Sequence, residues 1–152
     1  MHQPEQIALE DYQALAEFRY QLRRFTHFSE QEARAIGLEP QQHQLLLTVK
    51  GLPDGRKATI GEIAERLQIQ HHSTVELIDR LVERGLVERR RDEEDHRRVL
   101  VSLTEQGEDL LQRLSSVMLA ELHTTAPALV KTLGILIHAR TPDEAQDREK
   151  VK

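Results

Sequence analysis

The hydrophobic pattern of this chain changes period at Gly85, and this change constrains the fold more than any other feature. Before the glycine, the segments 60–67 and 73–84 carry apolar residues at spacings of three and four, which is the period of a helix. After it, 86–89 begins a strand, and apolar residues alternate with polar ones across 99–103. A charged run separates the two stretches and predicts a turn. The pattern therefore predicts two short helices joined directly to a β-hairpin.

Capping signals set the expected ends of the two short helices. Thr59 and Glu62 form one capping-box pattern, so we expect the first helix to begin at 60. Ser73 and Glu76 form a second such pattern, so we expect the next helix to begin at 73, after a polar turn over 68–72. Gly85 stands where that helix should end. The inner face expected for the second helix consists of Val75, Ile78, Leu81 and Val82.

Longer helical segments are expected before this core. An apolar stripe runs through 6–28 and predicts a first helix. Ser29 and the glutamate three residues later predict a separate short helix, which Gly37 would end. Pro40 suits the first position of another helix, which Gly51 stops, and a loop follows over 51–58.

After the hairpin, Thr104 and Glu105 should cap a long helix. Pro127 is expected to interrupt it, a further apolar helix is expected over 128–139, and a polar tail over 141–152. The predicted fold class is mainly α with a small β-hairpin wing (α+β), that is, a winged helix-turn-helix flanked by N- and C-terminal helices.

The composition narrows the classes of function. The sequence holds no cysteine, which excludes disulfides, thiolate zinc sites and thiol redox sensing. All five aromatic residues lie before position 29, so the helix–hairpin region cannot stack single-stranded bases on aromatic rings. A nucleic-acid partner would therefore be a duplex. The net charge of −5 opposes such a partner mildly, so the prediction must rest on local pattern.

We predict no enzyme, no metal site and no cofactor. The sequence has no Gly-x-Ser-x-Gly elbow and no Gly-rich phosphate loop. Its histidines include no His-x-x-x-His pair, and the adjacent His71 and His72 point in different directions, so they do not converge on a metal. The start of the chain lacks signal-peptide features, and no apolar run approaches the ~20 residues of a membrane span. A cytoplasmic protein is the expectation.

The two short helices suggest how a duplex could be bound. In a helix-turn-helix, the second helix inserts its N-terminal side chains into the major groove. Ser73 and Thr74 can bond phosphates or bases, and Glu76 can accept from a cytosine amino group. The residues expected to face DNA from this helix are His71, His72, Ser73, Thr74, Glu76 and Arg80. A plain helical hairpin in a globular core is the alternative.

The hairpin favours DNA over that alternative. Its strands and turn carry arginines at 89–91 and at 97–98. Arginine at a hairpin tip suits the narrow, electronegative minor groove. The alternative is a solvated charged turn, because the acidic residues 92–95 nearly balance the arginines. The wing residues expected at the interface are Arg91, Asp95, Arg97 and Arg98.

Residues 59–107 resemble the winged-helix core of the MarR (multiple antibiotic resistance regulator) family. The segment 37–41 resembles the start of that family's second helix. The resemblance covers the chain up to about residue 140, and its motifs stand in the order Ser73-Thr74-Val75, Asp79-Arg80-Leu81, Arg84-Gly85-Leu86-Val87, Asp95-His96-Arg97-Arg98 and Leu103-Thr104-Glu105-x-Gly107.

The resemblance implies a homodimeric transcription regulator, and we expect a repressor that binds palindromic duplex DNA. It places Arg97 at the wing tip and makes Asp95 the acid that braces the wing. The implied domains are N-terminal dimerisation helices over 1–36, a DNA-binding domain over 37–104, C-terminal dimerisation helices over 105–140 and a polar tail. The chain departs from the family at Glu76-Leu77, where many relatives have Thr-Arg, and it lacks the cysteine of the family's peroxide sensors.

The resemblance also implies a small-molecule crevice between the dimerisation helices and the DNA-binding domain. The first helix combines aromatic rings with arginines, which would suit an anionic aromatic acid. The residues expected to line this crevice are Tyr12, Arg19, Tyr20 and Arg23. The alternative is that the aromatic residues form a dimer core and the arginines a solvated face. For the protein as a whole, the alternative is a winged-helix protein-interaction module that does not bind DNA.

Overall fold

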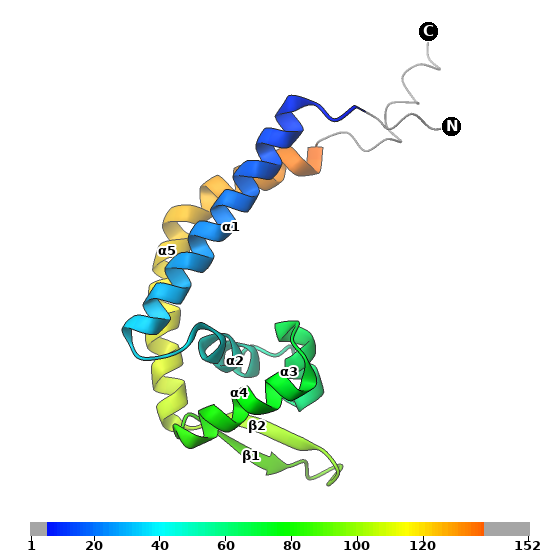
Figure 1. Ribbon diagram of the computed structural model, residues 1–152, viewed down its shortest axis with the longest axis vertical. Coiled ribbons are helices and arrows are strands. Elements are labelled where there is room, and N and C mark those ends of the chain that lie inside the picture. Colours follow the sequence, from blue (N-terminus) through cyan, green and yellow to red (C-terminus); the bar gives the residue numbers. More distant parts are fainter. Residues whose placement is uncertain (1–5, 139–152) are drawn as a thin grey trace, which may run out of the picture. The chain divides into compact units, whose positions relative to one another are not determined.

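The computed structural model describes residues 6–138 and divides the chain into two compact units (Figure 1). One unit holds the described parts of 1–28 and 120–152, and the other holds 29–119. Five helices and one two-stranded sheet are assigned within the described residues. No helix among them is long and apolar enough to cross a membrane. The predicted class, mainly α with a β-hairpin, is confirmed.

Helix α1 (Leu9–Ala35) is continuous, so the separate helix predicted after Ser29 is wrong. Ser29 is buried inside the helix, and neither glycine nor proline stands between Ser29 and Gly37. A capping-box pattern starts a helix only where the preceding backbone leaves the helical conformation, and here it does not. Gly37 ends the helix as expected, with φ of +82°.

Helix α2 (Pro40–Lys50) and helix α3 (Ile60–Leu67) have the bounds that their capping signals indicate. Pro40 is the first residue of α2, and Gly51 caps its end. The Thr59 Oγ1 atom accepts a hydrogen bond from the Glu62 backbone N–H at 3.1 Å and so caps α3.

Helix α4 (His71–Glu83) begins two residues earlier than the capping pattern at Ser73 predicts. Its N-cap is Gln70, whose side chain makes no capping hydrogen bond, so the sequence carries no strong signal at the true start. The buried face of α4 consists of Thr74, Leu77, Ile78 and Leu81. Of the predicted inner face, Ile78 and Leu81 are buried and Val75 is half-buried, whereas Val82 is exposed, so its predicted inward position is wrong.

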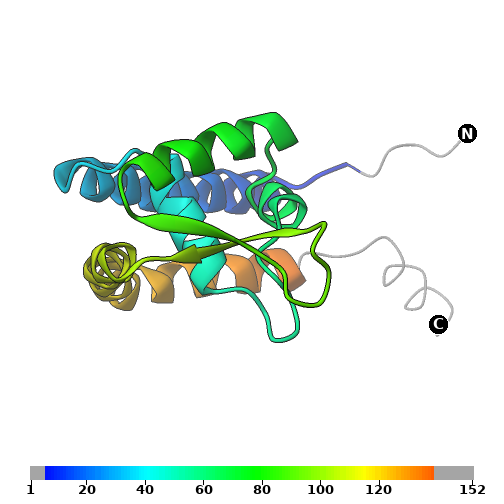
Figure 2. The ribbon, with the colours of Figure 1, turned by 90° about the horizontal axis from the view of Figure 1, so that it is seen from below.

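Strands β1 (Val87–Arg91) and β2 (Val99–Leu103) form the antiparallel wing, in the register Val87↔Leu103 to Arg91↔Val99. The predicted strict alternation of β2 is only partly correct, because Leu100 and Val101 are both buried. The other edge of β2 carries a bridge between Leu100 and Thr59. In Figure 2 the wing lies beside the loop that joins α2 to α3.

Helix α5 (Glu105–His138) is continuous through Pro127, so the predicted interruption is wrong. A proline removes one backbone hydrogen bond and bends a helix, but the turns on either side can continue it. Position 139 of the predicted last helix, and the tail over 141–152, lie outside the described residues.

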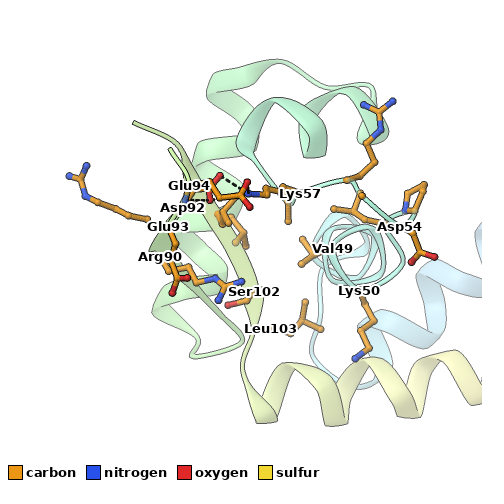
Figure 3. Close-up of a pocket in the computed structure, with 18 of the residues that line it drawn as sticks. Val49, Lys50, Asp54, Lys57, Arg90, Asp92, Glu93, Glu94, Ser102 and Leu103 are labelled. Carbon is orange, nitrogen blue, oxygen red and sulfur yellow. Dashed lines mark hydrogen bonds and ion pairs between the residues drawn. The ribbon is translucent and has the colours of Figure 1, made fainter. Parts of the chain in front are cut away.

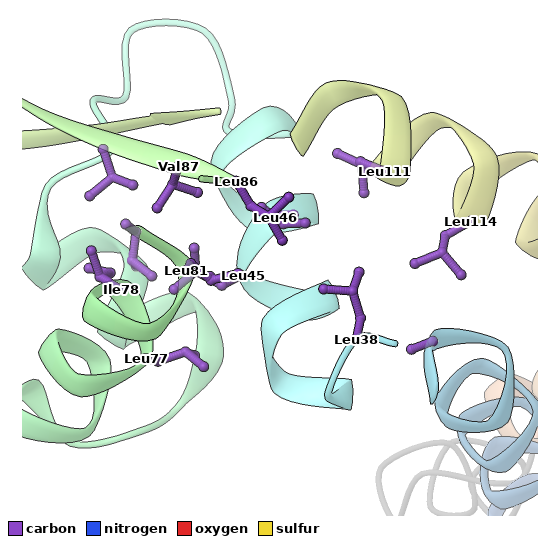
Figure 4. Close-up of a cluster of buried hydrophobic side chains, with 13 residues drawn as sticks. Leu38, Leu45, Leu46, Leu77, Ile78, Leu81, Leu86, Val87, Leu111 and Leu114 are labelled. Atoms are coloured by element: carbon purple, nitrogen blue, oxygen red, sulfur yellow. The ribbon is translucent and has the colours of Figure 1, made fainter. Parts of the chain in front are cut away.

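The core of the 29–119 unit joins α2, α4 and the wing (Figure 4). Leucines of α2 and α4 meet Leu86 and Val87, where the chain enters β1. The N-terminal half of α5 adds Leu111 and Leu114. Because α4 and the hairpin share this core, the helix and the wing are held in one packed unit.

Candidate nucleic-acid interface

The outward face of α4 carries the exposed side chains that could meet a ligand. His71, His72, Glu76 and Arg80 are exposed, and Ser73 is half-buried. These five are therefore accessible, as the helix-turn-helix pattern predicts. Thr74 is not, because its exposed fraction is 0% and its hydroxyl donates to the Gln70 backbone carbonyl at 3.0 Å. The predicted role of Thr74 in contacting bases is wrong.

Apart from Arg80, the charged side chains on the same face of α4 are acidic. Glu76, Asp79 and Glu83 are all exposed there. Asp79 pairs with Arg89 of β1, so this carboxylate is neutralised and also ties α4 to the wing. Arg89 therefore helps to hold the wing against α4. Within the described residues, Glu76 and Glu83 have no ion-pair partner and can accept hydrogen bonds.

The wing turn presents arginine side chains. The side chain of Arg97 is 92% exposed, and its Nε lies 3.1 Å from Asp95 Oδ1. The Arg97 side chain and backbone N–H both bond to Asp95, and this lowers the pKa of the Asp95 carboxyl below its ordinary value. Arg91 donates to the His96 carbonyl at 2.9 Å. Of the four predicted wing residues, Asp95, Arg97 and Arg98 thus lie in the turn, and Arg91 ends the strand that leads into it.

A second acid of the turn, Asp92, is not distinguished by the sequence. It is buried, whereas its neighbours Glu93 and Glu94 are exposed. The Glu94 backbone N–H and the Lys57 ammonium both bond to it and lower the pKa of its carboxyl. What sets Asp92 apart is its place in the folded hairpin, where its backbone N–H donates to the Arg98 carbonyl at 3.0 Å and closes the turn. In the sequence it is one of four consecutive acids.

A pocket of about 780 Å³ lies between the wing and the α2–α3 loop (Figure 3). Its walls include apolar side chains such as Val49 and Leu103, and it is crossed at one side by the Lys57 ion pairs to Asp92 and Glu94. The sequence pattern does not predict this pocket.

The predicted crevice residues of α1 lie at the surface. Tyr12 is 56% exposed and Tyr20 50%, and Arg19 and Arg23 are exposed as well. The Tyr20 ring is covered on one face by Arg24, 5.7 Å from the ring centroid. A pocket of about 500 Å³ in the same unit is lined instead by Asp11, Lys131, Gly134, Ile135 and His138. None of the four predicted crevice residues lines this pocket of the single chain.

Comparison with known protein families agrees with this arrangement. Residues 36–98, which contain α2, α3, α4 and the wing turn, match the model described as "MarR family". This part of the chain is therefore similar to MarR-family proteins. The resemblance predicted from the helix and wing motifs is thus confirmed. As in the MarR family, the described residues pair a helix-turn-helix with a β-hairpin wing.

One curated relative is similar to part of the chain. The organic hydroperoxide resistance transcriptional regulator of Bacillus subtilis is 37% identical to this chain over 68 residues. That match spans 45% of this chain and 44% of the relative, so it covers less than half the length of either protein.

Solved structures of MarR-family proteins share the fold over most of the chain. Apo MarR from E. coli has a TM-score of 0.62 and 22% identity, and the match covers 97% of this chain and 95% of that one. A mutant of E. coli MarR complexed with operator DNA has a TM-score of 0.59 and 22% identity, and covers 88% and 86%. The transcriptional regulator AbsC from Streptomyces coelicolor has a TM-score of 0.66 at 18% identity, and covers 96% and 91%.

Proposed function

We propose that this chain is a transcription regulator that binds duplex DNA through α4 and the wing. The observation that carries the proposal is the placement of the exposed α4 residues and the wing arginines in one packed unit of a MarR-family domain. Helix-turn-helix domains use such a helix in the major groove, and winged domains add the hairpin. The DNA-bound state of a structural relative supports this use of the fold.

The acidic face of α4 shapes the specificity that we expect. A carboxylate cannot contact a phosphate favourably, but it can accept a hydrogen bond from the amino group of cytosine. We therefore assign base contacts to Glu76 with His72 and Ser73, and phosphate or minor-groove contacts to Arg97 and Arg98. Apart from Arg80 of α4, the positive charge needed for DNA comes from the wing.

We propose that the chain acts as a homodimer. The unit formed by α1 and the second half of α5 exposes large apolar side chains, among them Leu9 at 66%, Val130 at 67% and Ile137 at 75%. A C2 dimer would bury such side chains with one self-complementary surface. Two copies of α4 related by a two-fold axis would bind a palindromic site with half-sites about one helical turn apart. Binding to a promoter in this way would repress transcription.

A ligand that releases DNA is the last part of the proposal. Tyr12 and Tyr20 offer aromatic rings, and Arg19 and Arg23 offer cations for an anionic aromatic acid. Because these side chains are exposed in one chain, a second chain would have to close the crevice. Benzoate should then raise the melting temperature of the dimer and weaken DNA binding over the same concentration range. Thermal stabilisation without loss of DNA affinity would contradict the regulatory part.

The absence of cysteine leaves no thiol for a response to hydroperoxides.

The test of the main proposal is a binding-site selection with the full-length chain and a randomised duplex library. We expect enrichment of one palindromic motif, and protection of two successive major grooves in a footprint of the selected duplex. A protein-interaction module is the second candidate, because the exposed face of α4 is acidic and the net charge is −5. Failure to enrich any motif would contradict the DNA proposal and favour that candidate.

A further inference from the structure

A buried carboxylate lies at the base of the wing turn, where Asp92 is 2% exposed. Its two oxygens lie 3.0 and 3.1 Å from Lys57 Nζ. Arg98 Nη2 lies 2.9 Å from Oδ2, and the Glu94 backbone N–H donates to Oδ1 at 3.0 Å. An anion this far removed from water is stable only when it is paired and hydrogen-bonded, and Asp92 satisfies both conditions.

Lys57 belongs to the chain segment that leads into the helix-turn-helix. The next residue, Ala58, accepts a backbone hydrogen bond from Val101 of β2 at 2.9 Å. Thr59 pairs with Leu100 and also caps α3. The ion pair between Lys57 and Asp92 thus joins the start of the helix-turn-helix to the far end of the hairpin, as Figure 3 shows.

The same carboxylate is connected to the arginines at the wing tip. Arg98 is tied to Asp92 by its side chain and by its backbone carbonyl. Its backbone N–H donates to the Asp95 carbonyl at 2.9 Å, and Asp95 in turn holds Arg97. The conformation of the turn that presents both arginines therefore depends on one buried residue.

We propose that Lys57 and Asp92 form a clamp that fixes the wing in its DNA-binding position. Both are positioning residues, and the proposal rests on the proposed function. The strands of the wing are packed into the core through Val87 and Val101, but no residue of the turn over 92–98 belongs to that core. Without the clamp, this turn would have to be ordered during binding. Holding it in place beforehand removes that entropic cost from the binding free energy.

The clamp predicts that replacing Asp92 changes DNA affinity in the direction opposite to the one expected from charge. Replacing an acidic side chain near DNA removes repulsion from the phosphates, so on charge alone it should strengthen binding. The clamp predicts that Asp92→Asn weakens binding instead. Glu93→Gln is the matched control, because Glu93 is the next acid in the same turn, is exposed and has no ion-pair partner among residues 6–138. This control should bind the duplex as tightly as the wild type or more tightly.

The experiment measures the Kd of the full-length variants for the duplex chosen by selection, with hydroxyl-radical footprints of each complex. Asp92→Asn and Lys57→Met should each weaken binding by roughly tenfold, within the range of coupling for residues in one ion-pair network. Their footprints should lose protection of the minor groove flanking the half-sites and keep that of the major grooves. The double variant should be no weaker than either single one, and Lys57→Arg should restore most of the affinity.

Three results would separate the explanations. If Asp92→Asn binds as tightly as Glu93→Gln, the clamp is wrong. If Lys57→Met lowers the slope of affinity against salt by about 0.9 per phosphate while Asp92→Asn tightens binding, Lys57 binds phosphate directly and the clamp is again wrong. If the wild type binds no duplex, the proposed function itself fails. Should Asp92→Asn not fold, Lys57→Met decides, because its side chain is 34% exposed and its removal leaves Arg98 beside Asp92.

Discussion

Thr74 and Glu76 lie two residues apart in α4 and on opposite faces of it. Thr74→Val should lower the free energy of unfolding by about 1 kcal/mol, because it removes the hydrogen bond to the Gln70 carbonyl. It should leave base preference unchanged. Glu76→Gln should leave stability unchanged and alter the preferred base, since a base-edge contact contributes roughly 1–3 kcal/mol of discrimination. Chemical denaturation and repeated binding-site selection measure the two effects. A changed motif for Thr74→Val would mean that α4 is rotated in the complex.

His43 is a second informative residue, because it is 2% exposed and both ring nitrogens lack a hydrogen-bond partner within the described residues. Burial lowers its pKa below the ordinary value of about 6.5. The unfolded chain therefore binds the proton more readily, and stability should fall as the pH drops below that value, by at most about 1.4 kcal/mol per pH unit.

The comparison of wild type with His43→Leu isolates this effect. Denaturant titrations between about pH 5 and 7 should show a shallower fall in stability for the variant. The lowered pKa values of Asp92 and Asp95 act in a different window, because their stabilisation disappears only as the pH falls below the ordinary range of a carboxyl. Identical pH profiles for the two proteins would show that the imidazole is not buried in its neutral form.

At the scale of elements, the join between the wing and α5 leaves no room for a side chain at Gly107. A Cβ there would overlap the backbone oxygen of Leu86. Gly107→Ala should destabilise the fold by about 1–3 kcal/mol, as overpacking does. Gly61→Ala in α3 is the control, because nothing lies within 4 Å of its Cβ position. That control should stabilise the protein by about 0.5–1 kcal/mol. Thermal melts compare them, and equal effects would contradict the close approach.

The elements differ in how well the sequence predicts them, and the reason is local. Helix α3 has a side-chain cap at Thr59 and is predicted to the residue, whereas α4 begins after an uncapped Gln70, two residues before the predicted start. The face of α4 that is buried matters for function, because Thr74 lies in the core rather than at the surface. A local capping pattern competes with the burial of Thr74, Leu77, Ile78 and Leu81, and the tertiary packing decides the outcome.

The candidate interface is predictable to a similar extent. The exposed wing residues follow from the charged turn, because arginines at a hairpin tip have no core to enter. The buried Asp92 cannot be predicted in the same way, since its partner Lys57 is 35 residues away and only the folded register brings them together. Long-range ion pairs of this kind leave no periodic signal in the sequence.

For the whole molecule, the exposed apolar side chains of α5 predict a dimer. Val130 and Ile137 are seven residues apart and share one helix face. Val130→Glu should shift the sedimentation coefficient from that of two chains towards that of one, because it places a charge in the buried interface. Leu47→Glu is the control, since Leu47 is also an exposed apolar residue, at 43%, but lies in the other unit. A monomeric wild type would contradict the dimer, and a dimeric Val130→Glu would place the interface elsewhere.

The most direct test of the central claim is the affinity of the full-length chain for its selected duplex across a series of salt concentrations. The account predicts a linear fall of log affinity with log salt, on the order of a thousandfold between 50 and 200 mM if about six phosphates are bound. Arg97→Ala should weaken binding and reduce the slope by about 0.9 for each phosphate that the arginine neutralises in each subunit. An affinity that is independent of salt, or an Arg97→Ala variant that matches the wild type in both affinity and slope, would contradict DNA binding through the wing.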